Sequence, residues 1–313
     1  LVARFTATRY FNFQGAIADE AGISSALDTR RAMLALVIPP DFATRLGAGR
    51  EVPVQAIVDG ADANTAGIVL GYTQAVVASH QAQIMLEVAR RTGGSPPAPS
   101  VDLRPRVWFN ADLESRNFIV PGIMAVIMGL IAALLTALTV AREWERGTME
   151  QLITTPVRPA EIILGKLLPY TVIGLANMTV AVLMTVFLFD VPLRGSVTLL
   201  FSAGLVFVVG TLAQGLFISA LARQQLLAAQ LAMVSTFLPA FLLSGFAFAI
   251  ANMPGPVRAI SHLVPARYFV SLVKGVFLRG TGLETLARDA LLLVVFAVAL
   301  LALAIRLTRG RLR

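Results

Sequence analysis

Long apolar runs with very few charged residues dominate the chain beyond residue 117. Four runs contain no charged residue and a fifth has charge only at its edge; they are Phe118–Ala141, Leu167–Phe189, Gly195–Ala222, Gln224–Val257 and Ala290–Ile305. A helix needs about 20 apolar residues to cross a bilayer. The pattern therefore predicts five membrane-spanning helices, near residues 118–141, 167–189, 197–221, 227–249 and 287–306. Buried helices of a large soluble protein do not recur at this length with so little charge between them.

The first part of the chain has the pattern of a small α/β domain. Segments rich in β-branched or aromatic residues predict strands at Phe5–Phe13, Met33–Ile38 and Val52–Val58. The segments around them predict helices at Ala16–Arg30, Asp41–Leu46 and Asn64–Arg91. Gly93–Ser100 (GGSPPAPS) is typical of a linker, and Arg106–Asn110 predicts a last strand before the membrane. The predicted fold is a polytopic α-helical membrane protein, with an α/β domain and linker at 1–117 and a transmembrane domain at 118–313.

Charge is distributed unevenly between these two parts. The chain has 313 residues and a net charge of +8, and residues 1–117 carry eleven basic and eleven acidic residues. The whole excess therefore lies in the apolar part. Nucleic-acid binding needs a basic face on a soluble fold, so this placement argues against it. The chain has no cysteine, which excludes disulfides and thiolate metal sites.

The loops between the apolar runs predict an orientation. Basic residues collect in the loop Arg142–Lys166, at Arg223 and in the arginine tail, and five crossings place all three on one side. Lys and Arg favour the cytoplasmic side of a membrane. The opposite side receives Arg194 and a loop with four further basic residues, Arg258, Arg267, Lys274 and Arg279, which runs against this bias.

Five crossings with a cytoplasmic tail place the N-terminal domain outside the cell. A polar domain does not cross a membrane without a signal or a preceding span. We therefore expect one more helix before Leu1 in the natural protein, which makes six spans. The alternative is a cytoplasmic domain at a true N-terminus, which would put the arginine tail outside.

The segment REWERGTMEQLITTPVRP, Arg142–Pro159, carries the densest charge of the apolar part. It predicts a helix over 142–154 that stops before Pro156. Charged residues three or four positions apart pair along one face, and Trp144 belongs to an apolar stripe. From the residues alone, the helix could be solvated, lie on the membrane surface, or present a charged face to a cytoplasmic partner.

Several segments resemble the ABC-2-type export permeases. Along the chain they are VDGADANTA, RVWFN, REWERGTMEQLITTPV with EIILGK after it, NMPGPVRAISHLVPARYF and KGVFLRG. Several of them occur in the order expected for the family. The resemblance covers nearly the whole chain and points to the branch with a large extracytoplasmic domain between its first two helices. The missing first helix is the departure from that pattern.

The resemblance implies a permease of the bacterial inner membrane with partners on both sides. These are an ABC ATPase subunit, which holds ATP and magnesium, a second permease half in a homo- or heterodimer, a periplasmic adaptor and membrane lipid. It also implies that the loop helix 142–154 is the coupling helix that contacts the ATPase. Its expected contact residues are Arg142, Glu143, Trp144, Glu145, Arg146, Gly147, Thr148, Glu150, Leu152 and Pro156.

Motifs for catalysis or cofactor binding are missing from the sequence. A phosphate-binding loop needs Gly-x-x-x-x-Gly-Lys-Ser/Thr, and the nearest candidate, Gly165-Lys166, has Ala160 and Leu167 at two required positions. The two histidines, His80 and His262, lack a metalloprotease context. We expect no catalytic, cofactor or metal residues, and an ATPase on another chain.

Two ladders of small residues predict close helix contacts. The first is Gly129, Ala133, Ala137 and Ala141, and the second is Ala228, Ala232, Thr236, Ala240 and Ser244. Chance periodicity is an alternative, because alanine is common here. The resemblance places the seam between permease halves partly on the fourth span, which favours the second ladder as that seam.

Residues 251–286 are too interrupted by proline to form a span. The segment contains Pro254, Pro256, Pro265 and Arg267. Non-helical backbone survives at membrane depth only where protein buries it or water lines it. We expect either short helices that re-enter the membrane from the outer surface, as the resemblance implies, or a surface loop under the outer domain.

The function expected from these features is export of a drug-like, lipid-like or other amphipathic substrate. One alternative is a secondary transporter, which would place ionisable residues near the midplane of its spans. The spans show none there. The other alternative is a membrane-anchored assembly or sensor protein, for which one span would suffice.

Overall fold

The structure, a computed structural model, describes residues 1–8, 10–48, 50–92, 101–110, 114–153, 155–250 and 253–311. The chain divides into two compact units, Leu1–Ser115 and Arg116–Arg313. Each unit has a hydrophobic core of its own.

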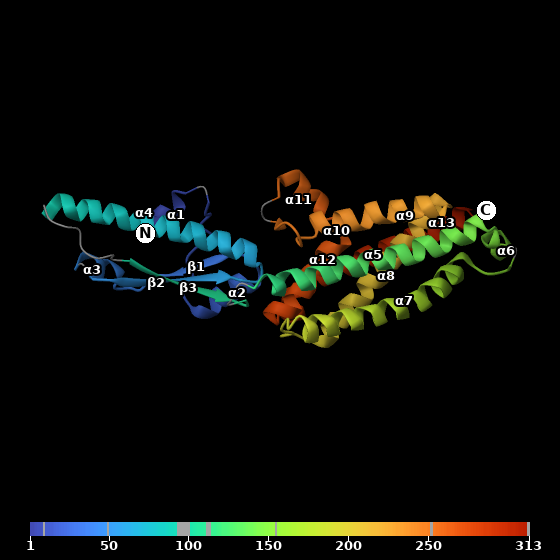
Figure 1. Cartoon of the computed structure of the whole chain (residues 1–313), viewed down its shortest axis with the longest axis horizontal. Coiled ribbons are helices and arrows are strands. Elements are labelled where there is room, and N and C mark those ends of the chain that lie inside the picture. Colours follow the sequence, from blue (N-terminus) through green and yellow to red (C-terminus); the bar gives the residue numbers. More distant parts are fainter. Residues whose placement is uncertain are drawn as a thin grey trace. The chain divides into compact units, whose positions relative to one another are not determined.

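The first unit is a three-stranded sheet with helices packed on it (Figure 1). Its elements are α1 (Val2–Thr6), α2 (Glu20–Asp28), β1 (Leu34–Val37), α3 (Phe42–Gly47), β2 (Val52–Asp59), α4 (Ala63–Thr92) and β3 (Val101–Trp108). The strand order is β1-β2-β3, with β1 antiparallel and β3 parallel to the buried central strand β2. Parallel neighbours need a crossover connection, and α4 provides it.

The strand predicted at Phe5–Phe13 is wrong. α1 covers the start of this segment, and its remaining described residues form no strand. Phe5 lies in the core beside Val54 and Val76, and its ring meets that of Phe11 with 5.2 Å between centroids. These aromatic residues pack onto the sheet and do not form part of it. A high β-propensity can reflect this kind of burial as well as strand pairing.

The other predicted elements of this unit are confirmed, with shifted ends. α2 begins at Glu20, because the carboxylate of Asp19 accepts a hydrogen bond from the backbone N of Gly22 at 2.9 Å and caps the helix there. β3 begins at Val101, five residues before the predicted start, and includes Pro105. An edge strand tolerates proline. The predicted linker at Gly93–Ser100 lies outside the described residues.

The second unit is helical throughout its described elements. They are α5 (Ser115–Glu145), α6 (Thr148–Ile153), α7 (Pro159–Leu183), η1 (Met184–Leu188), α8 (Val197–Ala222), α9 (Gln225–Ala232), η2 (Met233–Phe237), α10 (Leu238–Leu243), α11 (Gly255–Ser261), α12 (Pro265–Lys274), η4 (Gly275–Arg279) and α13 (Leu283–Arg311); the η segments are π-helical.

Five helical segments in the described chain are long and apolar enough to cross a membrane. They are Ser115–Glu145, Ala160–Leu188, Val197–Ala222, Gln225–Leu243 and Leu283–Leu307. Together with the small sheet, they confirm the predicted fold class.

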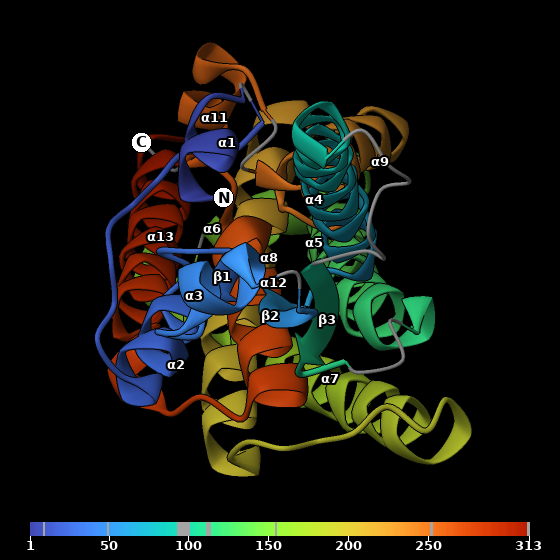
Figure 2. The same ribbon diagram turned by 90° about the vertical axis from the view of Figure 1, so that its left-hand side faces the viewer.

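α8 lies at the centre of the second unit, where small residues let its neighbours approach. Figure 2 looks along the bundle and shows α8 and α12 near its middle, with α13, α5 and α7 around them. A Cβ at Gly215 would stand 2.3 Å from the carbonyl oxygen of Ala133 on α5, and one at Gly210 would stand 3.3 Å from the Cα of Ala297 on α13. Glycine thus brings these helix backbones together, as in other membrane bundles.

Two predicted span ends differ most from the structure. The fourth span ends at Leu243, not at residue 249, because Gly245 takes a left-handed conformation (φ 81°) and its carbonyl accepts a hydrogen bond from Lys274. The second begins at Pro159, eight residues early. Proline suits the first helical position, and the Glu161 carboxylate accepts a bond from the backbone N of Arg158 at 2.9 Å.

Candidate functional site

The candidate site lies at one end of the second unit, where α5 ends, α6 follows, α7 begins and α8 passes into α9. Figure 1 shows α6 at this end and α11 at the opposite end of the same unit. We call this group of segments the α6 end. It includes the segment expected to be the coupling helix.

The predicted continuous helix over 142–154 is wrong, because the chain breaks at Gly147. α5 runs on through Arg142 to Glu145, and a separate short helix, α6, begins at Thr148. Gly147 has φ 72°, a left-handed conformation that other residues adopt only at a cost, and a Cβ there would meet no atom within 4 Å. Gly147 therefore permits a change of direction of the chain, and no close neighbour within the chain requires a glycine there.

Glu145 and Arg142 hold the start of α9. The Glu145 carboxylate accepts hydrogen bonds from the backbone N of Gln225 at 2.7 Å and from its side-chain amide. The Arg142 Nε donates to the amide oxygen of Gln225 at 3.2 Å. Gln225 is the first residue of α9, so one side chain links the last turn of the first span to the first turn of the fourth. We call these three residues the α5–α9 clasp.

A second contact joins the end of α5 to the connection between α8 and α9. The Arg223 guanidinium lies over the Trp144 ring, with 5.0 Å between its Cζ and the ring centroid. Arg223 caps the end of α8 in a left-handed conformation (φ 55°). The Trp144 indole Nε1 is buried without a hydrogen-bond partner among the described residues. The ring therefore serves as an apolar and cation-binding surface within the chain.

α7 is tied to α5 through one ion pair. The Lys166 ammonium pairs with the Glu143 carboxylate across 23 residues of sequence, and both side chains are partly buried. Thr148, at the start of α6, donates from its hydroxyl to the Glu143 carbonyl at 3.2 Å. The ion pair and the hydrogen bond flank the break at Gly147 and hold α6 between α5 and α7.

The sequence predicted that these charges contact a partner, and the structure uses several of them inside the chain. Glu143, Glu145, Arg142 and Trp144 all contact other segments of the same unit. The surface left for a partner is narrower, and it includes the exposed Arg146, Leu152 and Pro156. The side chain of Glu150 lies outside the described ones.

Sequence reasoning missed Gln225, Arg223 and Lys166 as parts of this site. Gln225 lies 80 residues from Glu145 and is uncharged, so no local pattern marks it. Arg223 offered a signal, because it is the only charge between the third and fourth apolar runs.

The five residues predicted as a seam between permease halves are buried within the chain itself. Ala228, Ala232, Thr236, Ala240 and Ser244 are all in the buried class. Ala228 and Ala232 pack with Ala137 and Ala141, so the two small-residue ladders meet each other. Ala228 and Ala232 therefore form a contact of α9 with α5, Thr236 accepts a hydrogen bond from Gln214 of α8, and the assignment of the seam to this ladder is corrected.

The segment predicted to re-enter the membrane forms α11, α12 and η4. Pro254 and Pro256 stand at the start of α11, and Pro265 begins α12, followed by Arg267. α12 is packed inside the unit: its Phe269 ring stacks on Phe207 of α8, with 4.2 Å between centroids. The segment therefore forms short helices, and their re-entry into the membrane stays a prediction.

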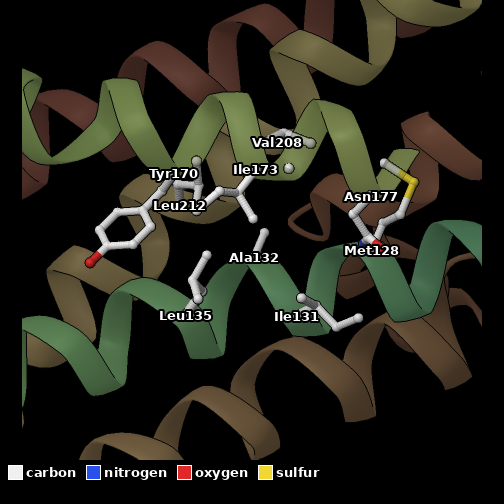
Figure 3. Close-up of a pocket in the computed structure, with 10 residues that line it drawn as sticks. Met128, Ile131, Ala132, Leu135, Tyr170, Ile173, Asn177, Val208 and Leu212 are labelled. Atoms are coloured by element: carbon white, nitrogen blue, oxygen red, sulfur yellow. The ribbon is translucent and has the colours of Figure 1, made fainter. Parts of the chain in front are cut away.

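A small cavity lies between α5, α7 and α8 (Figure 3). It encloses about 20 Å³ and is lined mainly by apolar side chains, with Asn177 among them. This volume holds roughly one water molecule. The cavity is therefore too small for a transported substrate in this conformation. The described residues contain no group of three or more His, Asp or Glu side chains placed to bind a metal.

Comparison with known proteins points to one family of membrane proteins. Residues 1–306 match the family model described as ABC-2 family transporter protein. The protein named "Probable multidrug ABC transporter permease YbhS" of Escherichia coli strain K12 is 41% identical over 278 residues, which is 88% of this chain and 72% of that protein.

Two further relatives from the same strain match at similar length. "Probable multidrug ABC transporter permease YbhR" is 30% identical over 91% of this chain and 75% of its own length. "Inner membrane transport permease YhhJ" is 31% identical over 92% of this chain and 75% of its own.

Proposed function

This chain belongs to the ABC-2 family of transporter proteins, and we propose that it is the permease subunit of an exporter for amphipathic, drug-like or lipid-like compounds. It is a transport subunit, and a separate subunit hydrolyses ATP. Family membership also implies an ABC ATPase as partner and a dimeric arrangement of permease halves.

The observation that carries the proposal is the α6 end. α6 is a short helix between α5 and α7 in the sequence, and the last turn of α5 beside it is tied to the starts of α7 and α9 and to the end of α8. A force applied to α6 by a bound ATPase would act on α5 directly, on α7 through Lys166 and on α9 through Gln225. One docking surface could thereby move most of the bundle at once.

The proposal divides the predicted coupling residues into two groups. Arg146, Leu152 and Pro156 are exposed and form the docking surface on the ATPase. Glu143, Glu145 and Trp144 pass the motion on within the chain. Gly147 sets the angle between the docking surface and α5.

Two lines of support bear on direction and substrate. Two of the relatives carry "multidrug" in their names, which favours export of apolar or amphipathic compounds. The second unit also buries very little charge: among its described residues, Lys274 is the only charged side chain that is buried. An interior with so little buried charge suits the passage of molecules with little charge.

Lys274 does not favour a secondary transporter. Its ammonium lies near the end of the bundle, beside Phe118 in the first turn of α5 and the Gly245 carbonyl after α10. A proton- or ion-coupling residue is expected near the midplane of the spans.

We further propose the inner membrane as location, with the α6 end in the cytoplasm and the α/β domain outside. The four arginines at the C-terminal end of α13 and beyond support this, because the positive-inside bias places them in the cytoplasm. The α/β domain would then be available to a periplasmic adaptor.

The test separates docking from transmission. The permease is expressed with its ABC ATPase, and charge is reversed at Arg146 and, separately, at Glu145. We expect Arg146→Glu to reduce co-purification of the ATPase, and Glu145→Lys to keep the ATPase bound while export falls. The matched control is Arg31→Glu, an exposed arginine of the first unit. If both variants bind the ATPase and export substrate as well as the control, the α6 end is not the coupling site.

A further inference from the structure

A cluster of arginines lies at the end of the second unit that carries α11. Arg258 is on α11, Arg267 on α12 and Arg288 near the start of α13. The Arg267 guanidinium lies within electrostatic range of the other two arginines and of Asp289. We call Arg258, Arg267 and Arg288 the arginine cluster. The cluster lies on the side of the membrane opposite the predicted cytoplasmic side. The preference of basic residues for the cytoplasm therefore does not explain it.

The turn that carries the cluster is firmly built. The Arg267 Nη1 donates to the buried Ser261 hydroxyl and to the Arg258 carbonyl, the latter at 3.3 Å. The Tyr268 hydroxyl donates to the His262 carbonyl at 2.8 Å, and its ring contacts Phe296 of α13 at 5.7 Å between centroids. These contacts attach the α11–α12 turn to α13 and hold the half-buried Arg267. Arg258 and Arg288 are more exposed, and the Arg258 Nη2 donates to the Met253 carbonyl at 3.3 Å.

Large apolar side chains surround the cluster and point outward. Ile260, near the end of α11, is 55% exposed, and Leu263, on the α11–α12 turn, is 70% exposed. Leu291 is 64% exposed and lies three residues after Arg288 on α13. Exposed leucine beside exposed arginine is the composition of a surface that sits at the boundary between lipid headgroups and acyl chains.

We propose that the arginine cluster binds the phosphate headgroup of an anionic membrane phospholipid, whose acyl chains lie along the apolar face of α13. Guanidinium groups bind phosphate oxygens through paired hydrogen bonds, and the cluster supplies three of them from three helices. Asp289 offsets part of the positive charge of the cluster.

His262 stands beside the cluster and can report on its charge. Burial lowers the pKa of His262, and the positive charges of Arg267 and Arg288 lower it further. The groups that face it are Arg267, Arg288 and the Tyr268 hydroxyl, whose oxygen lies 3.5 Å from the His262 Nδ1. A bound anionic headgroup would offset the arginine charges, so it should raise the pKa of His262.

The binding experiment uses native mass spectrometry on the purified full chain. The chain is titrated with phosphatidylglycerol, phosphatidylcholine and inorganic phosphate in separate series. We expect selective retention of phosphatidylglycerol, weakened about fivefold for each arginine lost in Arg258→Gln and Arg288→Gln. The control is Arg306→Gln, the same change near the opposite end of α13, which should leave this affinity unchanged.

The second readout locates the binding. The pKa of His262 is measured by NMR of labelled histidine in a His80→Gln background, in nanodiscs with phosphatidylglycerol as a minor component and in nanodiscs of phosphatidylcholine alone. We expect a higher pKa with phosphatidylglycerol, and a smaller difference in the Arg258→Gln/Arg288→Gln variant. Equal retention of both lipids, equal effects of the Arg306 control, retention of inorganic phosphate without lipid selectivity, or an unchanged pKa would each overturn the proposal.

Discussion

Adding one methyl group at Gly215 should separate α5 from α8. In Gly215→Ala the new Cβ would stand 2.1 Å from the Thr136 hydroxyl oxygen and 2.3 Å from the Ala133 carbonyl oxygen, whereas ordinary contact begins at 3.4 Å. The second atom belongs to the backbone, so a side-chain rotation cannot relieve the clash. α5 would have to retreat by about 1 Å, and overpacking of this kind costs about 1–3 kcal/mol.

Two further contributions decide whether Gly215→Ala raises or lowers the stability of the protein. The Thr136 hydroxyl donates to the Leu212 carbonyl at 2.9 Å, and a displaced α5 would weaken that buried bond, at a cost of about 0.5–1.5 kcal/mol. Replacing glycine by alanine inside a helix contributes at most about 1 kcal/mol in the opposite direction. The losses exceed the gain, so Gly215→Ala should destabilise the protein.

The assay is thermal unfolding of the purified chain in detergent, followed by loss of the monodisperse peak in size-exclusion chromatography. The matched control is Gly165→Ala on α7, where a Cβ meets no atom within 4 Å and only the helix preference changes. We expect a lower midpoint for Gly215→Ala than for the wild type, and an equal or higher midpoint for Gly165→Ala. The double variant Gly215→Ala/Thr136→Ala should not recover stability, because the Ala133 carbonyl remains. A midpoint for Gly215→Ala at the level of the Gly165 control would refute the close α5–α8 contact.

Three other predictions test the Lys274 contact, the need for a separate ATPase subunit and the proposed topology. Lys274→Met should lower the unfolding midpoint by leaving the Gly245 carbonyl unpaired, at a cost of about 1–3 kcal/mol, and an unchanged midpoint would show that this bond is dispensable. The purified chain should not hydrolyse ATP, since the phosphate-loop motif is missing from its sequence, and turnover in a preparation free of other ATPases would contradict this. Single cysteines at Ser95 and Thr308 should react differently with an impermeant thiol reagent in intact cells: labelling at 308 but not at 95 would invert the proposed topology.

Much of the fold could be read from the sequence because a bilayer restricts the choices. Inside hydrocarbon every backbone polar group must be paired within the segment, so a long apolar run can only be a helix. The α/β unit was harder. Its segment Phe5–Phe13 has strand-like composition, yet Phe5 serves the core from a helix, and composition cannot separate these two uses of an aromatic residue.

The candidate site was predicted in place but not in detail. The charges of Arg142–Glu150 marked a segment that differs from the spans around it. The sequence could not show which of these charges make contacts within the chain. Their partners, Gln225 and Lys166, lie far away in sequence. Gly147 carried a signal that was misread: glycine in a helical pattern can mark a helix end with positive φ, and the structure shows that here.

The fourth span is attached at its two ends and irregular in its middle, which bears on how motion would pass through it. The α5–α9 clasp holds its first residue, and the Lys274 ammonium holds the Gly245 carbonyl just after its last turn. Between them the helix passes through the π-helical segment η2, where the Thr236 hydroxyl accepts a bond from Gln214 of α8 at 3.1 Å. π-helical turns are looser than α-helical ones and occur often at functional sites. If the α6 end moves α9 while Lys274 keeps the other end in place, the difference must be taken up inside this span, where η2 interrupts the α-helical bonding.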